Sequence, residues 1–246
     1  MTAVPRVRAK TAAMRWQAEL DEKSGSLSQR IARFTACCES VTSSDKLARI
    51  LEIILALGNI LNRGTKRAAS GFKLSSLTKL SDTKASNKST TLLHYLAKTV
   101  EEKSSELLDF SDSLLAPLDA NKAVKVAELR AELRELRAGM AQLEEERAAC
   151  GEEDAFVQGT DDLHATASKR LSELDEALTS AASAGTKVRE YFGEDDAGGE
   201  AFECFAVLAT FCHAFGKAVG DNRARGGGTS SRGNSARGGG GASSAR

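Results

Sequence analysis

The chain has 246 residues, 41% of them apolar and 28% charged, which is enough to bury a sizeable core. Its 34 basic and 34 acidic residues cancel, but five arginines and one aspartate after Gly220 give that tail a net charge of +4 and leave −4 on residues 1–220. The sequence has no apolar run of about 18 residues, so no membrane helix is expected, and the N-terminus lacks the apolar core of a signal peptide. The five cysteines show no Cys-x-x-Cys spacing, which predicts buried thiols rather than disulfides or a metal site.

The composition favours an all-α fold, because helix formers dominate, only two prolines occur and no alternating strand pattern is found. Pro5 suits the first turn of a helix over about residues 5–22. Ser24-Gly25-Ser26 is expected to end that helix, and apolar residues spaced three and four apart predict a second helix over about 26–42.

A third helix, from Lys46 to about Asn62, carries apolar residues almost all the way round, so we expect it to be central and buried. Gly58 inside this helix lowers helix stability by about 1 kcal/mol relative to alanine. Because such a cost is usually tolerated where another chain segment packs closely, we expect close packing at Gly58. Asn62 and Gly64 are typical of a helix C-terminus.

The loop that follows is strongly basic. Seven cations fall within residues 63–88 and are opposed only by Asp82, for a local charge of +6. One interpretation is a solvated loop with scattered cations, and the other is a binding surface for an acidic partner on a rigid base. The cations are Arg63, Lys66, Arg67, Lys73, Lys79, Lys84 and Lys88.

Leucines three apart predict a short helix from Lys73 to Ser81-Asp82, and a further helix is predicted over about 90–110, with a break at Pro117. The clearest periodicity lies between Val126 and Leu143, where apolar residues alternate at spacings of three and four. A returning helix over about 161–188 completes an antiparallel hairpin, whose charged flanks are interpreted as solvated faces.

The last helix, about 200–219, contains four of the nine phenylalanines, which indicates a packing anchor. Residues 221–246 contain eight of the 21 glycines and are predicted to be a disordered tail rich in arginine, glycine and serine.

These motifs carry a family resemblance. Ile53 to Asn62 with its Gly-Asn-x-x-Asn end, Gly71-Phe72-Lys73-Leu74-Ser75 and Asp82-Thr83-Lys84 resemble the signature of formin homology 2 domains. Thr91 to Tyr95 resembles the helix that follows in that family. Tyr191 to Asp195 and the phenylalanine-rich helix resemble its C-terminal post region. The resemblance covers about residues 5–220.

The resemblance implies an actin-assembly module that nucleates filaments and stays at barbed ends, in the cytoplasm and on the actin cytoskeleton, with no catalytic residue, metal, cofactor or membrane contact. It implies an all-helical knob, coiled coil and post within residues 1–220. It places Lys73 at the actin-contacting surface, with Arg63, Lys66 and Lys79 as further candidates. The residues expected to shape a groove for the partner's lasso segment are Gly58, Asn59, Asn62, Gly64, Gly71 and Phe72.

The family domain is nearly twice as long, and its lasso, linker and first part of the knob have no counterpart in this sequence. We therefore expect impaired ring dimerisation. Two other classes stay open at this point. One is a passive coiled-coil scaffold that uses the 126–143 seam. The other is single-strand nucleic-acid binding by the tail, against which it counts that the arginine-glycine repeats are few and that no aromatic residues lie between them; the alternative is a flexible solubilising tail. No nucleophile elbow, phosphate loop or metal-ligand spacing indicates an enzyme.

Overall fold

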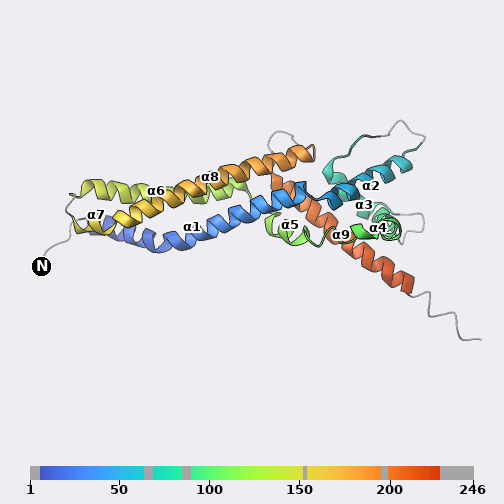
Figure 1. Cartoon of the computed structure of the whole chain (residues 1–246), viewed down its shortest axis with the longest axis horizontal. Helices are drawn as coiled ribbons and strands as arrows, with labels where there is room; N and C mark the ends of the chain where they lie inside the picture. Colours follow the sequence, from blue (N-terminus) through green and yellow to red (C-terminus); the bar gives the residue numbers. More distant parts are fainter. Residues whose placement is uncertain (1–5, 64–68, 85–89, 152–153, 195–198, 228–246) are drawn as a thin grey trace, which may run out of the picture.

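A computed structural model describes residues 6–63, 69–84, 90–151, 154–194 and 199–227. The molecule is elongated, with a long helical bundle at one end and a head of shorter helices at the other (Figure 1). The described residues are almost entirely helical and form no named strand, so the all-α prediction is confirmed.

Three long helices form the bundle: α1 (Val7–Thr42), α6 (Val126–Ala149) and α8 (Asp161–Tyr191). The short helix α7 (Ala155–Gly159) lies between α6 and α8 at the tip. The predicted hairpin of α6 and α8 is therefore confirmed. In addition, α1 packs along both α6 and α8, so the bundle has three helices. The seam of α6 is buried inside this bundle by residues of the same chain, namely Leu129, Leu133, Leu136, Met140 and Leu143.

The predicted break at Ser24-Gly25-Ser26 is wrong, because α1 continues through it for 36 residues. Ser24 is buried, and its hydroxyl accepts a hydrogen bond from Arg170 Nη1 of α8 at 3.2 Å. Leu20 and Leu27, one turn to either side, are also buried. Packing against α8 thus outweighs the weak helix propensity of this tripeptide.

The head contains α2 (Asp45–Leu61), the 3-10 helix η1 (Leu74–Leu77), α3 (Lys79–Asp82), α4 (Leu92–Lys103), the 3-10 helix η2 (Ser105–Leu107), α5 (Leu115–Asn121) and α9 (Ala201–Gly227). The helix predicted over 90–110 is shorter than expected, because α4 ends at Lys103. Pro117 was predicted to break the chain, but it lies in the first turn of α5, where its missing N–H has no helical partner to lose.

Helix α9 is the packing anchor of the head, as predicted. Phe205 packs edge-on against Phe34 of α1 at 5.7 Å between ring centroids, and Phe215 packs edge-on against Phe110 at 5.1 Å. By length and composition, Ala201–Gly226 is the one described helix that could cross a membrane. Its contacts with α4, α5 and α8 account for this apolar composition as that of a core helix.

Helix α9 is also longer than predicted, since residues 221–227 were assigned to the tail and are helical. Asn222 Nδ2 donates to the His94 carbonyl oxygen at 2.8 Å, and Arg223 Nε donates to Glu101 Oε1 at 2.7 Å. These side chains attach the final turns of α9 to α4. The predicted tail beyond them, 228–246, lies outside the described residues.

Candidate functional site

The site is built on α2, which projects from the head (Figure 1). The prediction that this helix is central and buried is wrong. Only Leu47, Ile50 and Ile54 are fully buried, whereas Ile60 and Leu61 are 66% and 60% exposed. One face of α2 packs on the head, and no described segment covers the rest, so apolar residues that encircle the helix cannot all be buried.

A groove of about 290 Å³ runs between α2, the segment before η1 and the C-terminal end of α8. Its floor and walls are mostly apolar and aromatic, with one carboxylate. Such a surface suits an extended segment that inserts apolar side chains. The lining residues are Ala48, Leu51, Glu52 and Leu55 of α2, Gly71, Phe72 and Leu74, and Tyr191 and Phe192.

The segment from Ala69 to Leu74 forms one wall of the groove and is attached at both ends. Asn59 of α2 makes two hydrogen bonds with Ala69, one to its carbonyl oxygen and one from its N–H, both at 2.9 Å. At the other end, the Leu74 N–H donates to Glu194 Oε1 at 2.7 Å. The segment is therefore fixed to α2 and to the loop after α8.

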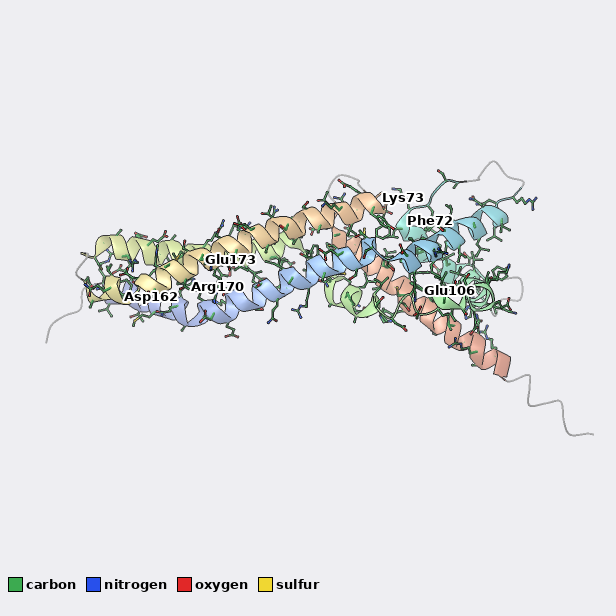
Figure 2. The ribbon with its side chains drawn as sticks, in the orientation of Figure 1. Phe72, Lys73, Glu106, Asp162, Arg170 and Glu173 are labelled. Atoms are coloured by element: carbon green, nitrogen blue, oxygen red, sulfur yellow. The ribbon has the colours of Figure 1, made fainter. Side chains whose placement is uncertain are left out.

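The predicted actin-binding cations lie at different places along this surface. Lys73 is exposed and lies beside Phe72 near the C-terminal end of α8 (Figure 2). Lys79 is exposed at the start of α3. Arg63 is exposed and directly follows the Asn62 cap at the C-terminal end of α2. Lys66 lies outside the described residues.

The predicted groove-shaping residues differ in what they do. Phe72 and Gly71 line the groove, and Asn59 attaches its wall, whereas Asn62 caps α2 with its N–H bonded to the Gly58 carbonyl oxygen at 3.0 Å. Close packing at Gly58 was predicted wrongly, because a Cβ at that position would meet nothing within 4 Å. Gly64 lies outside the described residues.

Sequence reasoning missed the aromatic wall at the end of α8 as part of the site. Tyr191 is 48% exposed and packs edge-on against Phe192, with ring centroids 5.0 Å apart. Gly193, at φ +64°, then turns the chain so that Glu194 reaches η1. The signal was an aromatic pair before a glycine at a helix end, but its partner segment lies more than 100 residues earlier.

The described residues contain no group of three or more histidine, cysteine or acidic side chains placed to hold a metal ion. Cys212 and His213 do not form a catalytic pair: burial raises the pKa of the Cys212 thiol to about 12, while His213 faces out and contacts Asp119 at 2.8 Å. The arrangement at the groove is suited to docking another chain.

A long three-helix bundle that ends in a helical head with an apolar groove defines an all-helical module. The family profile described as Formin Homology 2 Domain matches residues 1–216. This chain therefore belongs to the formin homology 2 family, as its motifs predict.

Several curated relatives resemble it. It is 34% identical over 224 residues to Formin-like protein 20 of Arabidopsis thaliana, covering 89% of this chain and 14% of that protein. It is 30% identical over 227 residues to Disheveled-associated activator of morphogenesis 2 of Gallus gallus, covering 90% and 21%. It is 37% identical over 147 residues to Protein diaphanous homolog 3 of Homo sapiens, covering 59% and 12%. The chain thus spans a minor part of each relative's length.

Proposed function

We propose that this chain is an actin-binding module that takes part in formin-type filament nucleation and barbed-end assembly. The observation that carries the proposal is the position of the Gly-Phe-Lys motif. Phe72 lines the groove and Lys73 is exposed beside it, so one short segment combines an apolar docking surface with a cation. The family membership supports the same proposal.

In this proposal, the groove takes an extended apolar segment and the cations contact acidic residues of actin. Arg63 and Lys79 are exposed and form no ion pair with any described residue, so partner binding does not require them to give up an existing one. The proposal also comprises action in the cytoplasm on the actin cytoskeleton and no catalytic activity. The scaffold alternative loses its support, because the α6 seam is buried within one chain.

The test is Lys73→Ala, measured by filament co-sedimentation and by pyrenyl-actin assembly. We expect the free energy of actin binding to weaken by about 2 kcal/mol, roughly a 30-fold rise in Kd, because the ammonium becomes desolvated against a carboxylate in the complex. Lys187→Ala is the matched control, since Lys187 is an exposed lysine on α8. An unchanged Kd for Lys73→Ala would remove this lysine from the site.

A further inference from the structure

The start of η1 is capped by a side chain from a distant part of the chain. Leu74 supplies the first N–H of η1, and this N–H donates to Glu194 Oε1 at 2.7 Å. Leu74 is 4% exposed and its bond to Glu194 is partly buried, so the bond lies at the edge of the core. Hydrogen bonds to a charged acceptor are stronger than neutral ones. This contact therefore links the groove wall to the loop after α8.

The carboxylate of Glu194 comes from a tightly fixed turn. Gly193 has φ +64°, a conformation that favours glycine, and its N–H donates to the Glu190 carbonyl oxygen at 3.1 Å. The Glu194 N–H donates to the Arg189 carbonyl oxygen at 2.9 Å, and Arg189 Nε donates back to the Glu194 carbonyl oxygen at 3.1 Å. The turn is therefore a rigid extension of α8.

Lys73 immediately precedes the capped N–H, in an extended conformation with φ −68° and ψ 138°. Its neighbours toward the N-terminus lead back to Ala69, which Asn59 holds to α2. A short segment held at both ends has few conformations left. The position of the Lys73 backbone is thus set by Asn59 at one end and by Glu194 at the other.

We propose that Glu194 is a positioning residue for Lys73, fixing where the groove wall presents this cation to an acidic partner. The inference rests on the proposed function, because it assigns Lys73 the contact with actin. Electrostatics alone predict the opposite effect of removing Glu194, since loss of a carboxylate near a cationic surface favours an acidic partner. The direction of the change therefore separates positioning from charge.

The first experiment follows the clamp without actin, by amide hydrogen exchange measured by NMR. Glu194→Ala should speed exchange of the Leu74 N–H by about tenfold, because its charged acceptor is lost. Glu194→Gln keeps an acceptor oxygen and should restore most of the protection. Glu190→Ala removes the same charge from an exposed position on α8 and should change nothing at Leu74. Equal exchange in all four proteins would overturn the clamp.

The second experiment is a double-mutant cycle on actin affinity. Glu194→Ala should raise Kd about five-fold, Glu194→Gln should stay near the parent, and Glu190→Ala should bind unchanged or more tightly. In a Lys73→Ala background, Glu194→Ala should have no further effect. Additive effects would show that Glu194 does not act through Lys73 and would overturn the proposal.

The two experiments fail separately. If Lys73→Ala leaves affinity unchanged, the proposed function of Lys73 fails, whatever the exchange data show. If Leu74 exchange responds as expected but affinity follows the lost charge instead, the positioning role fails while the clamp stands. If Glu194→Ala does not fold, Glu194→Gln still tests the proposal. Positioning requires slow Leu74 exchange and parental affinity in this variant, whereas charge alone predicts tighter binding. Fast exchange or tighter binding would overturn the positioning role.

Discussion

At the scale of single residues, burial controls the chemistry of the thiols. It raises the pKa of Cys37, Cys38 and Cys212 to about 12, and that of Cys204 to about 11. A raised pKa means that almost no thiolate, the reactive form, exists near neutral pH. Cys150 lies at the bundle tip and is only partly buried, so a reagent can reach it.

We therefore expect one of the five thiols to react quickly with a disulfide reagent at pH 8 in the native protein. Cys150→Ser should abolish that fast reaction, and denaturant should expose all remaining thiols. Absorbance of the released thiol at stopped-flow times measures the count. Two or more fast thiols in the native chain would contradict the burial of the other four.

The contacts of Asn59 show how far residue-level reasoning reached. Its place in the Gly-Asn-x-x-Asn motif predicted a groove-shaping role; the structure shows two hydrogen bonds between Asn59 and Ala69, and the role itself stays a prediction. The partner could not be predicted, because ten residues of loop separate the two and no periodicity governs such a contact. The same holds for Glu194 and Leu74, which are 120 residues apart.

At the scale of elements, the close approach of α1 and α6 depends on one glycine. A Cβ at Gly139 would lie 2.1 Å from Cδ1 of Trp16, so the indole ring packs directly against the α6 backbone. Its Nε1 is buried without a hydrogen-bond partner among the described residues, which is consistent with this dry contact. The contact fixes the spacing of the two helices.

Gly139→Ala should therefore destabilise the protein by about 1–3 kcal/mol through overpacking, although alanine is the better helix former. Gly25→Ala is the matched control: Gly25 is an exposed helical glycine of α1 whose added Cβ meets nothing within 4 Å. It should stabilise the protein by about 0.5–1 kcal/mol. Urea midpoints followed by the fluorescence of the single tryptophan measure both changes, and shifts of the same sign in both variants would contradict this account.

Periodicity predicted the elements better than their environments. The seam of α6 repeats over about three heptads, and so both its burial and its returning partner α8 could be predicted. The same pattern on α2 indicated burial on all sides, yet Ile60 and Leu61 are exposed. An apolar stripe shows that a face is available for packing, but whether a segment of the same chain or another molecule covers it depends on tertiary arrangement.

At the scale of the whole molecule, the net charge is zero, but within the described part of the chain some cations are paired with carboxylates and others are not. Bundle and head cations are often neutralised locally, as where Lys46 Nζ contacts Asp109 at 2.6 Å and thereby lowers the pKa of that carboxyl group. Arg63, after the C-terminal end of α2, and Lys79, at the start of α3, have no such partner among the described residues. The electrostatic field that an acidic partner meets therefore comes from nearby cations and not from the net charge of the chain.

Actin affinity should accordingly fall with ionic strength even though the chain is neutral overall, because exposed charges are screened within about 10 Å at 0.1 M salt. Arg63→Ala and Lys79→Ala should each raise Kd about threefold at low salt and flatten the dependence of log Kd on log salt. Lys169→Ala is the matched control: this exposed lysine lies on α8 about 33 Å along the helix from Tyr191 at the groove, several times the screening length, so the slope should stay unchanged. Co-sedimentation across a salt series measures all four proteins. Equal flattening by Lys169→Ala would mean that total charge governs binding and that the surface around the groove has no special electrostatic role.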